Sequence, residues 1–158
     1  RCLFIMRHGK ALSHAKSDSL RALSDAGRKQ IQLMLEYYGD KLGSVDAIWS
    51  SHYLRARQTA EIMADHCRCP HLIQPWLTPL DRPDQVLASL EKTDNTVLIV
   101  SHQPLVGDLL DHLGGFESGR YYLGTAAIAC LQFEWAVRGC AELLWLHQPT
   151  EMHPNSRD

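Results

Sequence analysis

The sequence predicts an α/β fold, a three-layer sandwich in which helices cover both faces of a mostly parallel central sheet. Short apolar runs of strand length lie at residues 2–7, 45–49 and 96–100. Between and after these runs, apolar residues recur at the three- and four-residue spacing of helices. Strands that alternate with helices form βαβ units, which bury a largely parallel sheet between two helical layers.

Caps and breaks place the helices along the chain. Ser24 fits an N-cap, and the helical pattern that follows it runs through Ile31, Met34, Leu35 and Tyr38 until Gly39. A second helix is expected from Leu54 to about His66, with Pro70 closing that element. Further helices are expected around residues 86–90 and from Pro104 to Gly114-Gly115.

The strand pattern changes towards the end of the chain. From Ala127 the apolar residues alternate with a period of two, and a turn through Arg138-Gly139 leads into a second alternating run. These runs predict a strand pair at the sheet edge, and a short strand is also expected at residues 71–74. Residues 1–148 are thus expected to form one domain, and residues 149–158 to form a mobile tail.

Composition excludes several classes of function. With 158 residues, 45% hydrophobic and 22% charged, the chain has the profile of one globular domain. A formal net charge of −2 argues against a nucleic-acid-binding surface. No run has the length of a membrane span, and no signal peptide is expected. Five cysteines fit buried thiols in a reducing compartment, so a cytoplasmic protein is expected.

Polar residues with catalytic chemistry follow the predicted strands. Arg7-His8-Gly9 comes directly after the first apolar run, Ser50-Ser51 after the second, and Ser101-His102 after the clearest buried run. Gly9 is expected to supply the backbone freedom for a sharp turn out of the first strand. Ligands bind beyond the carboxyl ends of strands in open α/β sheets, so these three loops should converge at one site. A histidine with an arginine beside it suggests phosphoryl transfer through the imidazole of His8.

Arg55 lies in the first turn of the helix that follows the second strand, where free N–H groups already favour an anion. Its guanidinium adds a bidentate contact for phosphoryl oxygens, whereas Arg57 is interpreted as a solvated surface residue. His102 is positioned to donate to a phosphoryl oxygen in the transition state. Six further histidines are interpreted as surface or packing residues: His14, His52, His66, His112, His147 and His153.

These motifs together resemble the signature of the histidine phosphatase superfamily, and the longer segments around them resemble the SixA-type phosphohistidine phosphatases. The motifs are Arg7-His8-Gly9, Leu54-Arg55-Ala56-Arg57-Gln58-Thr59 and Ser101-His102, with Leu20-Arg21-Ala22-Leu23-Ser24 and residues 100–107 in addition. The resemblance implies a fold without a cap subdomain and a hydrolase with His8 as phosphoacceptor. It also implies a phosphate pocket formed by Arg7, Arg55 and His102, with Arg21 as a further phosphate contact.

The substrate is expected to be a phosphohistidine-containing protein of a signalling or phosphotransfer pathway. An imidazole leaves more easily than an alkoxide, and of the loop carboxylates considered as a general acid, Asp81 and Glu117, neither has a compelling motif. Lys10 adds positive charge at the mouth of the site. Two alternatives stay open: a small phosphomonoesterase of the same superfamily, and a non-catalytic phosphate-binding module.

No cofactor or metal is expected for this chemistry. The ligand types in His66-Cys67-Arg68-Cys69-Pro70-His71 would suit zinc, but the donors are packed too tightly along the chain for a standard tetrahedral site. We therefore interpret this segment as structural.

Overall fold

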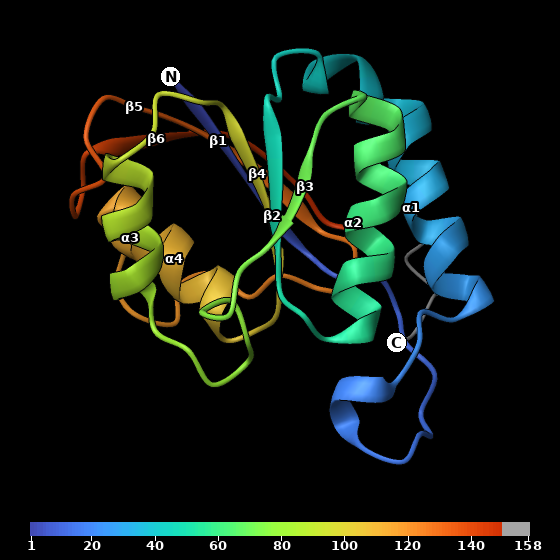
Figure 1. The fold of residues 1–158 in the computed structure, drawn as a ribbon. Coiled ribbons are helices and arrows are strands. Elements are labelled where there is room, and N and C mark those ends of the chain that lie inside the picture. The colour runs from blue at the N-terminus through green and yellow to red at the C-terminus, as the bar shows by residue number, and fades with distance from the viewer. Residues whose placement is uncertain (150–158) are drawn as a thin grey trace.

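The computed structural model describes residues 1–149, which form a six-stranded sheet between two pairs of helices (Figure 1). The strands lie in the order β3-β2-β4-β1-β5-β6. Their bounds are β1 Cys2–Arg7, β2 Ala47–Ser50, β3 His71–Ile73, β4 Val97–Ser101, β5 Ile128–Phe133 and β6 Ala141–His147. The pairings among β1 to β4 are parallel, and those of β5 with β1 and with β6 are antiparallel.

Helices α1 and α2 lie on one side of the sheet, and α3 and α4 on the other (Figure 1). The helices span α1 Asp25–Tyr38, α2 Leu54–Cys67, α3 Pro83–Glu91 and α4 Leu105–Gly114. This arrangement confirms the expected three-layer sandwich. The expected tail falls largely on residues 150–158, which lie outside the described part.

Alternation along the strands divides the core into two layers. In β1, Leu3 and Ile5 pack with α3 and α4, whereas Phe4 and Met6 pack with α1 and α2. Successive strand side chains point to opposite faces, so a strand covered on both sides must be apolar throughout. That requirement explains why the β1 and β4 runs read as continuous rather than alternating hydrophobic sequence.

The predicted cap of α1 is present, but its predicted stop acts differently. Ser24 Oγ accepts a hydrogen bond from the Gly27 N–H at 3.0 Å. Gly39 keeps a right-handed helical conformation and leads into a short 3-10 turn, η2 Gly39–Leu42. A Cβ at Gly39 would lie 2.7 Å from the ring of His66, so the glycine permits close approach of α2 rather than a left-handed turn.

The two strands predicted near the C-terminus, β5 and β6, lie next to each other at one side of the sheet. Of these two, only β6 is an edge strand. β5 lies between β1 and β6 and pairs antiparallel with both, with Phe4 of β1 opposite Cys130. The turn before β6 contains Gly139 with φ of +74°, a conformation that favours glycine. Among residues 1–149, no helix is both long enough and apolar enough to cross a bilayer.

Strand register brings the three predicted loops together. Arg7 pairs with Ser101 across β1 and β4, and Ser50 pairs with Val100 across β2 and β4. All three strands are parallel, so their carboxyl ends share one edge of the sheet. His8, Ser51 and His102 each follow directly and therefore lie next to one another at that edge.

Candidate active site

The backbone of His8 is fixed by both neighbours of β1. Its N–H donates to the carbonyl of Ser101 at 3.0 Å, and its own carbonyl accepts from the Ala126 N–H at 2.9 Å. The next residue, Gly9, donates from its N–H to Oγ1 of Thr59 in α2 at 3.1 Å. A residue whose backbone is held this way has little freedom to move relative to the sheet.

Gly9 was expected to allow a sharp turn, but the structure shows a different need for it. Its φ is not positive, and a Cβ there would lie 2.9 to 3.0 Å from Leu23, Gly27 and Ile31. On the α1 side, a Cβ at Gly27 would lie 2.1 Å from the carbonyl oxygen of Lys10. The two glycines thus let α1 pack directly against the loop that carries His8.

The hydrogen bonds of His8 define its protonation. Nδ1 lies 2.7 Å from the carbonyl oxygen of Gly9, which only accepts, so Nδ1 carries the proton. Arg55 Nε donates to Nε2 at 3.3 Å, so Nε2 presents a lone pair. Burial, followed by the charges of Arg55, Arg7 and Arg21, lowers the pKa of His8 to about 3 against the opposing hydrogen bond to Gly9. His8 is therefore a neutral imidazole at physiological pH.

Arg55 is the most buried cation of the site, with 4% of its surface exposed. Besides its contact with His8, it donates from Nη1 to the carbonyl oxygen of Asp18 at 2.8 Å and from Nη2 to the Asp18 carboxylate at 3.1 Å. The guanidinium also lies over the ring of Tyr53, 5.0 Å from its centroid. These contacts hold the guanidinium in one orientation beside His8.

Arg7 is held by the segment that precedes β5. Its Nη1 donates to the hydroxyl of Tyr122 at 3.1 Å and to the carbonyl of Leu123 at 3.0 Å. Its Nε is buried and has no hydrogen-bond partner within residues 1–149. The side chain thus approaches the pocket as a fixed cation with an unused donor.

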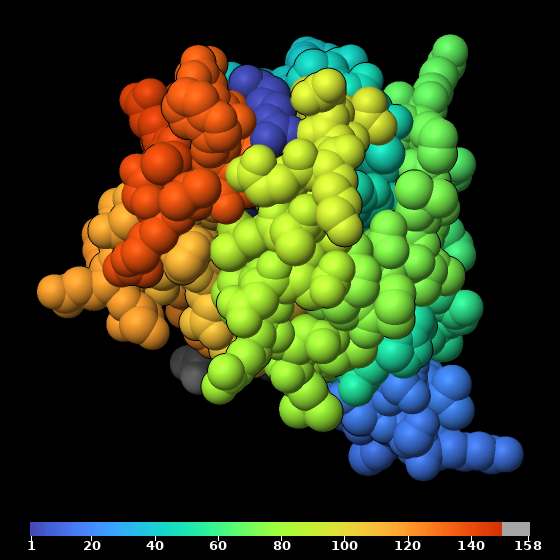
Figure 2. Space-filling view, turned by 60° about the vertical axis from the view of Figure 1, so that its left-hand side comes forward, coloured from blue at the N-terminus to red at the C-terminus, as the bar shows by residue number. Residues whose placement is uncertain are grey.

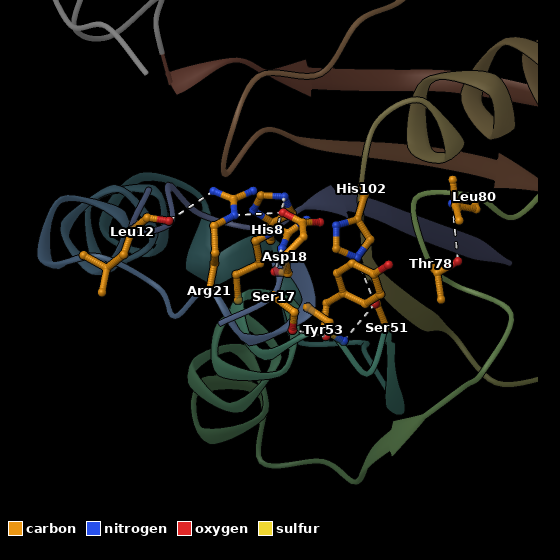
Figure 3. Close-up of polar contacts among 12 residues, drawn as sticks. His8, Leu12, Ser17, Asp18, Arg21, Ser51, Tyr53, Thr78, Leu80 and His102 are labelled. Carbon is orange, nitrogen blue, oxygen red and sulfur yellow. Dashed lines mark hydrogen bonds and ion pairs between the residues drawn. The ribbon is translucent and has the colours of Figure 1, made fainter. Parts of the chain in front are cut away.

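His102 lies beside His8, with 5.0 Å between the ring centroids. Its Nε2 is 2.8 Å from Oγ of Ser51. Burial first, and then electrostatic interactions with the neighbouring His8, Arg55 and Arg7, lower the pKa of His102 to about 2, so this imidazole is also neutral. Figure 3 shows the ring between Ser51 and His8.

Arg21 reaches the site from the segment between β1 and α1, which projects from the body of the molecule (Figure 2, blue). This segment contains a 3-10 turn, η1 Asp18–Leu20. Arg21 Nε donates to Asp18 Oδ1 at 2.8 Å, and its Nη1 donates to the carbonyl of Leu12 at 3.1 Å (Figure 3). Asp18 therefore accepts hydrogen bonds from Arg21 and Arg55 at once.

One pocket of about 410 Å³ brings all five predicted site residues together. Its lining is dominated by cationic and imidazole side chains, with a single carboxylate: Arg7, His8, Lys10, Ala11, Ser13, Asp18, Arg21, Arg55, Pro79, His102, Gln103 and Thr125. A concave site with this charge and a neutral imidazole is chemically suited to a phosphoryl group.

Comparison with known proteins agrees with this geometry. The sequence model of the histidine phosphatase superfamily (branch 1) matches residues 3–81. Phosphohistidine phosphatase SixA of Escherichia coli K12 is 34% identical over 152 residues, covering 87% of this chain and 94% of the relative. The chain belongs to the histidine phosphatase superfamily. This membership confirms the predicted fold without a cap subdomain and the predicted family. It also confirms the expectation of a phosphatase-type hydrolase.

Two further comparisons support this membership. The SixA homologue of Haemophilus influenzae is 35% identical over 126 residues, covering 72% of this chain and 77% of that protein. A solved structure of the protein histidine phosphatase SixA complexed with tungstate superimposes with a TM-score of 0.86 at 32% identity, covering 96% of this chain and 99% of the other. The similarity thus extends past the residues matched by the superfamily model.

The loop carboxylates considered from the sequence do not reach the pocket of this superfamily member. Asp81 accepts hydrogen bonds from the N–H and the hydroxyl of Thr78, so it closes its own loop, and Glu117 is absent from the lining. Lys10 does line the pocket. Arg57 does not, but it is half-buried with a buried Nε, so the prediction of a solvated surface residue is wrong for that atom.

Sequence reasoning missed Asp18, which lines the pocket together with the predicted site residues. It lies in a 3-10 turn without a recognisable motif, so only its spacing from Arg21 offered a signal. Gln103 and Thr125 were missed as lining residues too. Thr125 comes from an irregular segment, where no periodicity indicates which side chain faces the site.

The histidines and cysteines at residues 66–71 have partners other than a metal. His66 Nε2 lies 3.0 Å from the carbonyl of Gly39, and His71 Nε2 lies 2.6 Å from Oγ of Ser50. Burial first, and then the neighbouring Cys69, raise the pKa of Cys67 to about 11, which disfavours the thiolate that binds zinc. Within residues 1–149, no group of three or more potential ligands is arranged to hold a metal ion.

Proposed function

We propose that this protein is a phosphohistidine phosphatase that hydrolyses a protein phosphohistidine through a covalent phospho-His8 intermediate. The observation that carries the proposal is the Nε2 lone pair of His8, which lies in a pocket lined by Arg7, Arg21 and Arg55. A neutral imidazole is a nucleophile, and fixed cations around it stabilise the charge of a transferring phosphoryl group.

The reaction has two steps. In the first, His8 Nε2 forms a bond to phosphorus while the bond from phosphorus to the substrate nitrogen breaks, and the departing imidazole takes its proton from solvent. In the second, water attacks the phosphorus of phospho-His8, the bond to Nε2 breaks and inorganic phosphate leaves. Arg7, Arg21, Arg55 and His102 would donate to the equatorial oxygens in both steps.

The state of Asp18 favours phosphohistidine over phosphate esters. Partial burial acts to raise the pKa of this carboxyl, but hydrogen bonds from Arg21 and Arg55 outweigh it and lower the pKa below the ordinary value. Asp18 is therefore ionised at neutral pH and has no proton for an alkoxide leaving group. A phosphoramidate needs less acid catalysis because imidazole is the better leaving group.

A protein substrate also fits the surroundings of the pocket. Within residues 1–149 no helical subdomain is inserted over the site, although Pro79 of the loop before α3 lines one wall. A phosphorylated side chain presented by another protein can enter such a site without a lid. That this protein belongs to a signalling or phosphotransfer pathway stays a prediction. The cytoplasmic location and the independence from metals are predictions too.

A direct comparison of substrates tests the proposal. Purified protein should release phosphate from a phosphohistidine domain far faster than from glucose 6-phosphate or 3-phosphoglycerate at equal concentration. Efficient turnover of the small esters with none of the phosphohistidine domain would instead identify a small phosphomonoesterase.

His8→Ala tests the nucleophile separately. The variant should lose turnover by a factor of about a thousand or more and form no acid-labile phosphoenzyme when mixed with radiolabelled substrate. His112→Ala, at the far end of α4, serves as the matched control and should retain both. If the native protein and both variants released no phosphate from any substrate, the chain would be a non-catalytic phosphate-binding module.

A further inference from the structure

The two ring nitrogens of His102 have different surroundings. Nε2 lies 2.8 Å from Oγ of Ser51, whereas Nδ1 is buried and has no hydrogen-bond partner within residues 1–149. The neutral ring carries one proton, on either nitrogen. Only a proton on Nδ1 leaves a donor available for an oxyanion in the pocket, because Nε2 already faces Ser51.

The hydroxyl of Ser51 distinguishes the two tautomers. This serine is fully buried, and its Oγ already accepts a hydrogen bond from the Tyr53 N–H at 3.1 Å. A hydroxyl also has one hydrogen to donate. In the described part of the chain, the acceptor that lies within hydrogen-bond distance of this hydrogen is Nε2 of His102.

Counting unpaired groups decides between the tautomers. With the proton on Nε2, the buried Ser51 hydrogen and the Nδ1 lone pair of His102 would both lack partners. With the proton on Nδ1, Ser51 donates to Nε2, and the Nδ1–H alone is left unpaired. Unpaired buried polar groups are costly, so the second arrangement is favoured.

We infer that Ser51 is a positioning residue that holds His102 as its Nδ1–H tautomer, with the free N–H available to a phosphoryl oxygen. The ring lies 5.0 Å from that of His8, between Ser51 and the nucleophile (Figure 3). The inference rests on the proposed function for its purpose, since it explains how the site keeps a neutral imidazole as a donor. The position of the proton on the His102 ring does not depend on that function.

Nitrogen-15 NMR of the labelled protein measures the tautomer without any substrate. In native protein at neutral pH, Nδ1 of His102 should show the shift of a protonated pyrrole-type nitrogen and Nε2 that of an unprotonated, pyridine-type nitrogen. In Ser51→Ala, Nε2 loses its donor, and part of the population should move its proton to Nε2. Ser50→Ala is the matched control, because the hydroxyl of this buried neighbour bonds to the Ser51 carbonyl and to His71, whereas the bond to Nε2 of His102 comes from Ser51.

Tungstate binding, measured by calorimetry, then checks the consequence quantitatively. If only the Nδ1–H tautomer binds the oxyanion well, the dissociation constant should rise by the reciprocal of the fraction of rings left in that form. An equal mixture of the two tautomers would weaken binding about twofold. A population with one-fifth of its rings in the Nδ1–H form would weaken it about fivefold. Ser50→Ala should leave both the spectrum and the dissociation constant unchanged.

A native spectrum with the proton on Nε2 would overturn the inference, as would a Ser51→Ala variant whose His102 stays fully in the Nδ1–H form. The native spectrum decides even if Ser51→Ala does not fold. The expected tautomer in a protein that hydrolyses no phosphohistidine would refute the proposed function and leave this inference standing.

Discussion

The carboxylate of Asp18 lies 3.1 Å from Nη2 of Arg55, inside the pocket that the proposed reaction needs for phosphate. The same carboxylate lies 2.8 Å from Nε of Arg21. Two of the cations available to an incoming dianion are thus already paired with an internal anion. Asp18 orients the guanidinium groups and at the same time reduces the positive potential of the pocket.

Replacing Asp18 with asparagine should separate these two effects. Removing the negative charge should tighten tungstate binding by about threefold or more, because a carboxylate no longer repels the dianion. The Asp18 side chain is 59% exposed, so salt should screen the gain, and the effect should shrink as ionic strength rises. We expect kcat to fall in the same variant, since Arg55 loses an orienting contact. Weaker tungstate binding at low salt would contradict this account.

Arg55→Lys keeps a charge at this position but removes the planar fork. A lysine ammonium cannot contact His8, the Asp18 carbonyl and the Asp18 carboxylate together as the guanidinium does. We expect kcat/KM for a phosphohistidine domain to fall by a factor of about one hundred or more, with the melting temperature showing whether the fold is intact. Nearly full activity in a folded variant would mean that charge alone suffices at this site.

Arg21→Ala should act mainly on binding. This side chain is partly exposed, and its hydrogen bonds go to Asp18 and to the Leu12 carbonyl, so we expect it to contribute a hydrogen bond and charge for the phosphoryl oxygens. Loss of such a charged hydrogen bond should raise KM by about tenfold and change kcat less. Arg28→Ala, an exposed arginine of α1 outside the pocket, is the control. An unchanged KM would exclude Arg21 from phosphate binding.

The lowered pKa of His8 predicts a pH dependence of stability. The unfolded chain takes up a proton at His8 as pH falls through 6.5, whereas the folded protein resists it until about pH 3. The free energy of unfolding should therefore decrease as pH falls within this window, by at most about 1.4 kcal/mol per pH unit for this group. Urea denaturation between pH 5 and 6.5 should show a shallower decrease in His8→Ala. Equal slopes would place the folded pKa near its ordinary value.

The acid limb of the rate profile gives an independent check on the same group. With His8 neutral down to about pH 3, kcat/KM should not fall with an apparent pKa near 6.5. A fall in kcat/KM with an apparent pKa near 6.5 that persists when each of the other histidines is replaced would assign the ordinary pKa to His8.

The strands and the main site residues were predictable because two patterns coincide in them. In β1 and β4, a continuous apolar run ends at a polar, chemically competent residue, and the parallel arrangement of strands then determines where those residues meet. The position of His8 and His102 side by side follows from register. No knowledge of side-chain packing was needed for that result.

The irregular segments account for what the sequence did not reveal. Asp18 enters the pocket from a 3-10 turn, and Tyr122 holds Arg7 from the segment between α4 and β5. Neither segment has a periodicity that relates side-chain direction to position. Gly9 shows a related limit, since its sequence context suggested a turn, whereas the reason for a glycine is the proximity of α1, a contact between distant residues.

The contact of Arg7 with Leu123 makes the proposed phosphate pocket a product of both halves of the polypeptide. The superfamily model ends at residue 81, yet His102, Gln103 and Thr125 complete the wall. A truncated gene product that ended after α3 would retain the Arg-His-Gly triplet and still lack the scaffolding for catalysis. Genome surveys that assign activity from the N-terminal triplet alone would count such inactive fragments as enzymes.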